Sequence, residues 1–384
     1  MYRKIILSIC LIIGVSLLYC LNLSKPTKTT VQFASWGSES EIAILKPILK
    51  NFETENPDIK IDFMHIPQNY FQKIHLLFAS NTAPDVIFMN NQYLPIYANA
   101  GVLEDLTNTF DFSSFYPQTI NALSWKGKIY AVPRDVSNLV IFYNKDIFDK
   151  YNVPYPNKNW TIQDFLSTAE KLTHRPNIFG ISFEEEPLMF LPYLTSLGGG
   201  FEPKKINTVN SRRALKFYAD LRNKYHVAPQ KDESASATMA QMFLQGKLAM
   251  HLSGRWLVPK YREEAKFDWD IINFPTGNTT SSYIPLDASG WGISKSSKHK
   301  KEAIRLVKYL SSKTSSQEFT KSGLIVPARI DVANSTTFLD KEKPYNAKIF
   351  LDVIKKSKPT PVTVNYRETL DNIKNDTEHL FNTK

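Results

Sequence analysis

The sequence predicts an α/β fold of two lobes. Its 384 residues are too many for one ordinary hydrophobic core. Strand-like and helix-like segments alternate along the chain, which is typical of a layered α/β protein. No internal repeat and no long low-complexity linker divides the sequence. We therefore expect two lobes that share the chain back and forth, and not two consecutive domains.

The first quarter of the body contains strand–helix units. The expected elements are a strand over 31–34, a helix carrying Ile42, Leu45, Leu49 and Phe52, a strand over 59–63, a helix over 70–80 and a strand over 85–89. The helix residues recur at helical spacing, and residues 59–63 alternate like a half-buried strand. The nearly all-apolar run at 85–89 suits a parallel strand that is covered on both faces.

The stretch Pro133–Phe148 places a polar group directly before an apolar run. Arg134, Asp135, Ser137 and Asn138 precede the strand-like run from Leu139 to Tyr143. Taken alone, the polar group would be a surface turn before a buried strand. The following residues 144–146 have the composition of a turn and a helix start.

The second half repeats the same alternation. Thr161 and Asp164 resemble a capping box at a helix start, and Ser211 is a candidate cap for a later helix. Residues 247–252 and 269–274 are predicted strands. Two further helices carry the apolar residues Ala303, Ile304, Val307 and Leu310, and then Leu370, Ile373 and Leu380.

Several classes of function have no support in the sequence. The net charge is +10, but the Lys residues are spread out and do not alternate with aromatics, so no nucleic-acid partner is expected. Phosphate-loop, dinucleotide, serine-hydrolase and zinc-protease motifs are missing from the sequence. We therefore expect no cofactor, no metal site and no enzyme activity. The acidic run at 184–186 keeps a glycosidase-type hydrolase open as an alternative.

The N-terminal segment predicts export. Arg3 and Lys4 precede an apolar run from Ile5 to Leu23, which is the pattern of a signal peptide or membrane anchor within residues 1–24. Both cysteines, Cys10 and Cys20, lie in this segment, so no disulfide is expected in the body. Cys20 is a possible lipidation site, although Tyr19 departs from the small residue usual at that position. We expect a location outside the cytoplasmic membrane, in the periplasm or on its outer face.

Eight short segments, in their order and spacing, resemble a known family. They are 51–60 (NFETENPDIK), 83–86 (APDV), 97–106 (YANAGVLEDL), 127–133 (GKIYAVP), 143–146 (YNKD), 246–250 (GKLAM), 253–256 (SGRW) and 322–329 (SGLIVPAR). Together they resemble the extracellular solute-binding proteins of ABC importers, in the maltose-binding-protein-like branch that binds sugars and glycerol phosphates.

This resemblance implies a periplasmic-binding-protein-like fold with hinge crossovers and a central ligand cleft. The implied segments are 25–136 for the first part of lobe 1, 137–286 for the first part of lobe 2, 287–335 for the return to lobe 1, and 336–384 for the C-terminal helices of lobe 2. The implied function is a monomeric substrate-binding subunit that captures a sugar or oligosaccharide and delivers it to the permease. A polyol-phosphate-binding protein and a scaffold without ligand remain the alternatives.

The resemblance also implies which loops face the cleft. A sugar site needs hydrogen-bonding groups for hydroxyls and flat aromatic rings for C–H faces. The expected ligand-binding residues are Trp36 with Ser38 and Glu39, Tyr70, Asn91, Gln92, Asp135, Ser137, Asn138, Ser253, Arg255, Trp256, Asp287, Ser289, Trp291, Tyr366 and Arg367. Three of these are tryptophans that could stack on a neutral saccharide, which makes that ligand the first choice. Arg255 and Arg367 could instead hold a phosphate by forked hydrogen bonds.

Overall fold

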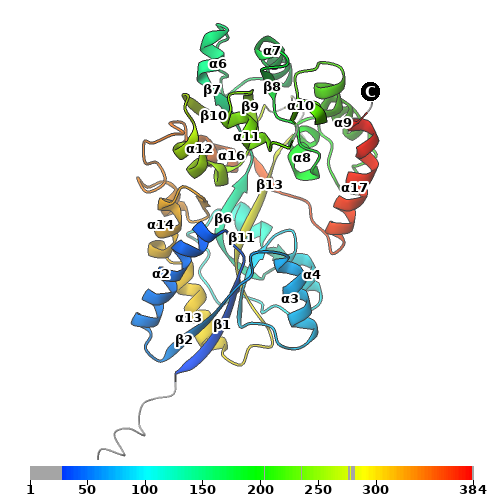
Figure 1. Ribbon diagram of the computed structural model, residues 1–384. Helices are drawn as coiled ribbons and strands as arrows, with labels where there is room; N and C mark the ends of the chain where they lie inside the picture. Colours follow the sequence, from blue (N-terminus) through cyan, green and yellow to red (C-terminus); the bar gives the residue numbers. More distant parts are fainter. Residues whose placement is uncertain (1–27, 203, 235, 276, 278–281, 383–384) are drawn as a thin grey trace, which may run out of the picture.

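The computed structural model describes residues 28–202, 204–234, 236–275, 277 and 282–382. Figure 1 shows two α/β lobes, one above the other, joined by the long strands β6 and β11. The predicted two-lobe α/β fold is confirmed. The predicted signal or anchor segment, with Cys10 and Cys20, lies outside the described residues. Within the described part of the chain, no helix is both long and apolar enough to cross a membrane.

Lobe 1 is built on a mixed sheet with the strand order β12-β6-β11-β3-β1-β2. Its strands are β1 (Thr29–Ser35), β2 (Ile59–His65), β3 (Val86–Asn90), β6 (Ala131–Asn138), β11 (Ile284–Ile293) and β12 (Val326–Pro327), and β13 (Ser357–Pro359) pairs with the start of β11. Strand β1 runs parallel to β2 and β3, whereas β11 runs antiparallel to β3 and β6. Strands β1 and β3 therefore both lie inside the sheet, and for β3 the nearly all-apolar sequence predicted this.

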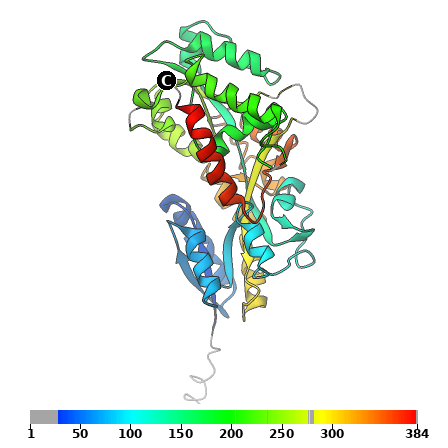
Figure 2. The ribbon, with the colours of Figure 1, turned by 90° about the vertical axis from the view of Figure 1, so that its right-hand side faces the viewer.

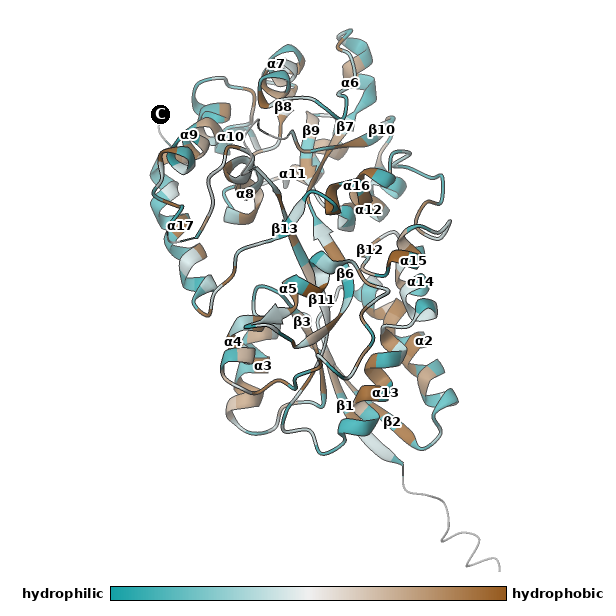
Figure 3. Cartoon of the chain, turned by 180° about the vertical axis from the view of Figure 1, so that it is seen from behind, coloured by the Kyte–Doolittle hydropathy of each residue, from teal (hydrophilic) through white to brown (hydrophobic). Residues whose placement is uncertain are grey.

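Helices cover both sides of the lobe 1 sheet. They are α2 (Glu39–Glu55), α3 (Tyr70–Ala79), α4 (Leu94–Asn99), α5 (Pro117–Ala122), α13 (Lys300–Leu310), α14 (Lys313–Lys321) and α15 (Ile330–Ala333), with a small hairpin of β4 (Ser124–Trp125) and β5 (Lys128–Ile129). Helices α2, α13 and α14 lie on one side, and α3 and α4 lie on the other (Figures 1 and 3). Pro47 lies inside α2.

Lobe 2 is built on a four-stranded sheet with the order β10-β7-β9-β8. Its strands are β7 (Val140–Asn144), β8 (Phe179–Ile181), β9 (Leu248–Ser253) and β10 (Trp269–Asn273). Its helices are α6 (Lys145–Lys150), α7 (Ile162–Leu172), α8 (Pro187–Ser196), α9 (Val209–Asn223), α10 (Lys231–Ser234), α11 (Met239–Leu244), the 3₁₀ turn η1 (Arg255–Leu257), α12 (Val258–Glu264), α16 (Lys348–Ile354) and α17 (Tyr366–Phe381). Helix α17 packs on α8 and α9 and extends toward lobe 1 (Figure 2). It is rich in hydrophilic residues, whereas β11 is largely apolar (Figure 3).

Local cap signals were read correctly at one helix and wrongly at another. Thr161 and Asp164 form the predicted capping box at α7. Ser211 is not the cap of α9, because Thr208 holds that position and its hydroxyl accepts the Ser211 backbone N–H at 3.3 Å. The Ser211 hydroxyl instead donates to the Lys205 carbonyl at 2.7 Å. Two hydroxyl residues lie three positions apart here, and the sequence alone does not say which of them starts the helix.

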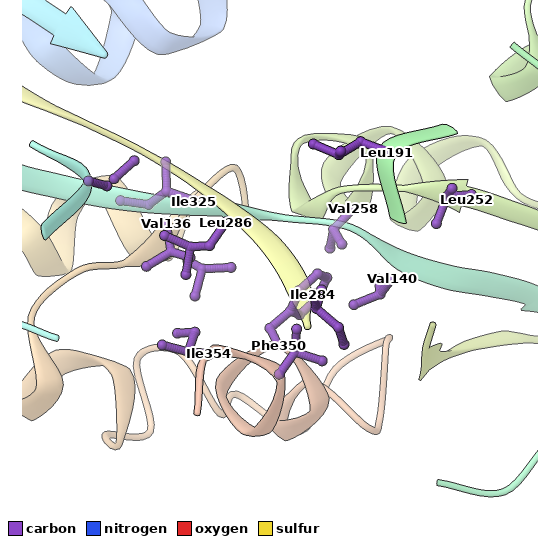
Figure 4. Close-up of a cluster of buried hydrophobic side chains, with 14 of the residues drawn as sticks. Val136, Val140, Leu191, Leu252, Val258, Ile284, Leu286, Ile325, Phe350 and Ile354 are labelled. Carbon is purple, nitrogen blue, oxygen red and sulfur yellow. The ribbon is translucent and has the colours of Figure 1, made fainter. Parts of the chain in front are cut away.

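An apolar cluster packs against the strands that connect the lobes. Figure 4 shows Val136 of β6 and Leu286 of β11 beside Ile325, with Phe350 and Ile354 of α16 below them. The same cluster continues into lobe 2 through Val140, Leu191, Leu252 and Val258 (Figure 4). Burial of these apolar side chains stabilises the strands at the place where they pass from one lobe to the other. The predicted lobe boundaries at 136/137, 286/287 and 335/336 stay predictions.

A β-bulge interrupts the pairing of β6 with β11 beside this crossing. Asp135 lies opposite Ser289, and Pro133 lies opposite Gly290, so Arg134 has no partner in the register. An extra residue in one strand changes which side the next side chain takes. Arg134 and Asp135 therefore both line the same cavity, although they are sequence neighbours in a strand. The polar group before residue 139, which taken alone would be a surface turn, is the buried end of β6.

We predict that Gly290→Ala destabilises the protein by about 1–3 kcal/mol, the usual cost of overpacking. A Cβ at Gly290 would lie 2.2 Å from the carbonyl oxygen of Val132, which cannot move without disturbing the bulge. Gly292→Ala is the matched control in the same strand, because its Cβ would lie 3.3 Å from the nearest atom, the Tyr130 carbonyl oxygen. Urea unfolding measures both variants. Equal stabilities of the two variants would contradict the prediction.

Candidate ligand-binding site

A cleft of about 630 Å³ lies between the lobes, at the carboxyl ends of β1 and β3. This volume falls within the range of small-molecule sites. Lobe 1 contributes residues after β1 and β3 and at the start of α3, and lobe 2 contributes residues from α8, η1 and α17. Strands β6 and β11 form the floor between them. Ten predicted site residues line this cleft: Trp36, Tyr70, Asn91, Gln92, Asp135, Ser137, Trp256, Asp287, Ser289 and Arg367.

The floor is organised by a buried ion-pair network around Arg134. Its guanidinium donates to Asp135 at 2.7 and 2.6 Å and pairs with Glu41 of α2 at 3.0 Å. Burial lowers the pKa of Arg134, but the two adjacent carboxylates outweigh this and raise it. Asp135 also accepts the Ser289 backbone N–H at 3.2 Å and hydroxyl at 2.8 Å. The network therefore ties β6, β11 and α2 together beneath the cleft.

A second carboxylate, Asp287, is fixed by two amides. Asn91 donates to one of its oxygens at 2.8 Å, and Gln92 donates to the other at 2.9 Å. The Asn91 side-chain oxygen accepts the Ala288 backbone N–H at 3.1 Å, which sets the orientation of the amide. Asp287 and Ser137 both line the cleft, and each offers oxygen atoms that can accept a hydrogen bond from a hydroxyl group. This arrangement suits a ligand with hydroxyl groups.

Two exposed tryptophans line the cleft, one from each lobe. Trp36 of lobe 1 is 43% exposed and lies beside Phe88, with the ring centroids 6.2 Å apart. Trp256 of lobe 2 is 41% exposed. Its ring folds back over Gly254, where a Cβ would lie 1.9 Å from a ring carbon. Glycine at position 254 therefore leaves room for the Trp256 ring to lie over the backbone.

Arg255 does not line the cleft, although it was expected there. Its guanidinium lies over the Phe338 ring at 4.2 Å and near the Phe350 ring at 5.7 Å. Its nitrogens are buried, and no hydrogen-bond acceptor is assigned to them within the described chain. Burial, with repulsion from Arg262, lowers the pKa of Arg255 to about 9, so the side chain stays charged at neutral pH. Its contacts are cation–π contacts that hold η1 against the segment around α16.

Trp291 is a core residue instead of a stacking residue. It is fully buried in lobe 1, with ring centroids 5.5 Å from Phe33, 6.1 Å from Phe88 and 6.2 Å from Phe319. It supports the site from below, since the guanidinium of Arg134 lies 5.5 Å from its ring. The expectation that it contacts ligand overlooked that the inner end of β11 passes through the centre of the lobe.

Five other expected residues also lie away from the cleft, and one of them, Ser38, is the N-cap of α2, whose hydroxyl accepts the Glu41 backbone N–H at 3.3 Å. Asn138 faces the opposite side of the strand and donates to the Phe350 carbonyl at 2.9 Å. Ser253 is buried in β9 opposite Val140. Tyr366 is buried, and its burial, with the nearby Asp287 carboxylate, raises the pKa of its phenol. Glu39 is 88% exposed at the start of α2, 3.9 Å from His65.

Sequence reasoning missed several residues that line the cleft. They are Asn69, Phe71, Gln72, Phe88, Asn90, Tyr93, Arg134, Leu188, Met189 and Ala288. A signal existed for Asn90 and Tyr93, because they flank the expected Asn91 and Gln92 after a buried strand. Arg134 was visible in the polar group of β6. Leu188 and Met189 carried no signal, since apolar residues at a helix start are ordinary core candidates.

The acidic run that favoured a hydrolase lies outside the cleft. Glu185 pairs with Arg222 at 2.8 Å and with Lys231 at 3.2 Å, and Glu186 pairs with Lys374 at 2.5 Å. Glu184 lies 3.7 Å from the buried His251. These contacts connect the segment before α8 with α9, α10, α17 and β9 of lobe 2. Within the described part of the chain, no cluster of His, Cys, Asp and Glu side chains could hold a metal ion.

The fold and the cleft together define a two-lobe ligand-binding protein. The profile of the family described as bacterial extracellular solute-binding protein matches residues 36–317. This match covers most of the chain, and the protein therefore belongs to that family. The predicted family is confirmed.

Two curated relatives come from Bacillus subtilis. A galactooligosaccharide-binding protein is 23% identical over 376 residues, which span 92% of this chain and 86% of the relative. A maltodextrin-binding protein is 25% identical over 342 residues, which span 83% of this chain and 77% of the relative. Among solved structures, an ABC substrate-binding protein of Listeria monocytogenes in complex with cycloalternan superposes with a TM-score of 0.83. It is 27% identical, and the match covers 92% of this chain and 94% of that one.

We predict that Trp291→Ala lowers the free energy of unfolding by about 3–5 kcal/mol, since it empties a large buried site. Trp36→Ala is the matched control, because its ring is partly exposed and its removal leaves no closed cavity. Urea unfolding of both variants, followed by circular dichroism, gives the two values. A Trp291→Ala protein as stable as Trp36→Ala would show that Trp291 is not a core residue.

Proposed function

We propose that this protein is the substrate-binding subunit of an ABC importer and captures a neutral oligosaccharide outside the cytoplasmic membrane. The observation that carries the proposal is the pair of exposed tryptophans, Trp36 and Trp256, on opposite lobes of one cleft. Flat rings can bury the C–H faces of a sugar at low entropic cost. The carboxylates and amides of the floor can bond its hydroxyls, and closure of the lobes would exclude water from these bonds.

The charges in the cleft favour a neutral ligand over a phosphorylated one. The Arg134 charge is matched by Asp135 and Glu41, and Asp287 adds another carboxylate with no cation among its hydrogen-bond donors. A phosphate in the cleft would approach two aspartates. Arg367 is the remaining cation of the cleft lining, and it lies exposed at the rim. The glycerol-phosphate alternative therefore has weaker support.

The named ligands of the relatives support the same class. The two Bacillus proteins are named for galactooligosaccharides and maltodextrins, and the Listeria protein was solved with cycloalternan. These ligands are neutral saccharides of several units. We extend the class to this chain, and we leave the identity of the sugar units open.

Binding without turnover is part of the proposal. Asp135 and Asp287, the carboxylates on the cleft floor, are each held by two or more hydrogen bonds. A glycosidase needs a pair of carboxyl groups that flank the scissile bond, whereas hydrogen bonds within the floor already engage both aspartates. The proposed partners are the saccharide, the permease and the membrane. The proposed tether is the segment 1–24, with Cys20 as its lipidation site, and the proposed state is a monomer.

We predict that Trp256→Ala and Trp36→Ala each weaken saccharide binding by about 1–3 kcal/mol, as is usual for an aromatic contact residue. Tyr345→Ala is the control, because Tyr345 is an aromatic residue that is 61% exposed and does not line the cleft. Isothermal titration with linear gluco- and galacto-oligosaccharides measures affinity, and melting curves check folding. If both tryptophan variants bound saccharides as tightly as the wild-type protein does, the binding site would have to lie outside this cleft.

We predict no cleavage when the protein is incubated with any saccharide that it binds. Chromatography of the saccharide after prolonged incubation is the measurement, and heat-denatured protein is the control. Release of shorter sugars by the native protein alone would replace the binding function with a hydrolase. A thermal shift with glycerol phosphates, and none with the oligosaccharides, would favour the polyol-phosphate alternative.

A further inference from the structure

A second cavity, of about 410 Å³, lies on lobe 1 between α3 and α4. Phe71, His75 and Leu76 line it from α3, and Ile96 and Tyr97 line it from α4. On α3, Phe71 and His75 are four residues apart, which places them on one helix face. We refer to this cavity as the α3–α4 groove.

The groove is continuous with the cleft. Phe71, Gln72, Tyr93 and Arg367 line both cavities. The rings of Phe71 and Tyr93 are stacked, with centroids 3.9 Å apart and planes inclined by 9°. This stacked pair forms the common border of the two cavities. A ligand that fills the cleft can therefore pass over it into the groove without leaving the protein surface.

The two cavities differ in chemistry. Asp135 and Asp287 line the cleft, but no carboxylate lines the groove. The groove has aromatic and aliphatic walls, and Gln72, His75 and Arg367 supply its polar groups. Leu76 is 67% exposed, the highest value among the large apolar side chains that the structure describes. Together with Phe71, Ile96 and Tyr97, Leu76 gives the groove a contiguous apolar wall, and such a wall beside a ligand cleft indicates a contact surface.

Arg367 connects the groove to the other lobe. It lies at the start of α17, which packs on α8 and α9 of lobe 2, whereas the other groove residues belong to lobe 1. No ion pair joins Arg367 to another described residue. Its guanidinium is therefore available to hydrogen-bond oxygen atoms of a ligand at the border of the two cavities.

We propose that the α3–α4 groove is an extension site that holds the outer sugar units of an oligosaccharide whose inner units fill the cleft. This inference rests on the proposed saccharide-binding function and deepens it. The outer units lie with their C–H faces on Phe71, Tyr93 and Leu76, and their hydroxyls reach Gln72, His75 and Arg367. The groove thereby makes affinity depend on chain length. The preferred ligand is longer than the cleft alone accommodates.

The test uses the variant Leu76→Asp, which places a charge on the apolar wall. Because Leu76 is largely exposed, the variant is expected to fold. Leu76→Met keeps an apolar side chain and serves as the conservative variant. Val209→Asp, at a residue that is 63% exposed and outside both cavities, controls for an added surface charge. The probes are linear gluco- and galacto-oligosaccharides from disaccharide to heptasaccharide, titrated by calorimetry.

We expect the affinity of the wild-type protein to rise with chain length and then level off. Leu76→Asp should weaken the longest ligands about tenfold, as loss of a contact residue does, and change the shortest bound ligand less than about twofold. Leu76→Met and Val209→Asp should both resemble the wild-type protein. Melting curves confirm that each variant is folded.

Two results separate failure of this inference from failure of the proposed function. If the wild-type protein binds saccharides but Leu76→Asp weakens all lengths equally or none, the groove is not an extension site and saccharide binding still stands. If the wild-type protein binds none of the saccharides, the proposed function and the extension site both fall. A nitrophenyl disaccharide serves as one further probe. If Leu76→Asp weakens only this ligand and leaves heptasaccharide binding unchanged, the proposal is overturned, because the groove then takes an aromatic substituent.

Discussion

The cleft depends on one buried interaction, the ion-pair network of Arg134 with Asp135 and Glu41. A buried guanidinium is costly unless its charge is matched, and breaking such a pair leaves an unpaired charge in a dry environment. The network spans β6 and α2 and continues through Ser289 into β11. These are elements from distant parts of the sequence. The same contacts that neutralise the charge therefore also fix the floor on which a ligand lies.

The order of strands and helices could be read from the sequence because it depends on local periodicity. Strands β1, β2 and β3 and helices α2 and α3 begin and end within a few residues of their predicted positions. The bulge at Arg134 could not be read in this way. It arises from the pairing of β6 with β11, which is more than 100 residues away, and no local pattern marks the unmatched residue. The prediction of the N-cap of α9 was wrong for a related reason, since Thr208 and Ser211 carry the same local signal.

The candidate site was predictable where a side chain directly follows a buried strand. Trp36, Asn91 and Gln92 satisfy that rule and line the cleft. The prediction of site residues failed inside long strands, where the burial of a side chain depends on what packs against each face of the sheet. Trp291 and Asn138 both lie in strands that contribute other residues to the floor, but their own side chains face away from the cleft. Which face a residue takes is settled by tertiary packing that a single sequence does not display.

The contacts of Trp256 have a consequence for the thermodynamics of capture. Gly254 leaves room for its ring, and the neighbouring Arg255 is held between the rings of Phe338 and Phe350. The backbone at Trp256, which lies in η1 next to the buried Arg255, is therefore ordered when the chain folds, before any ligand arrives. Ordering a side chain on binding costs about 0.5–1.5 kcal/mol. At Trp256 this cost is limited to the exposed ring, because the backbone that carries it is already ordered by folding.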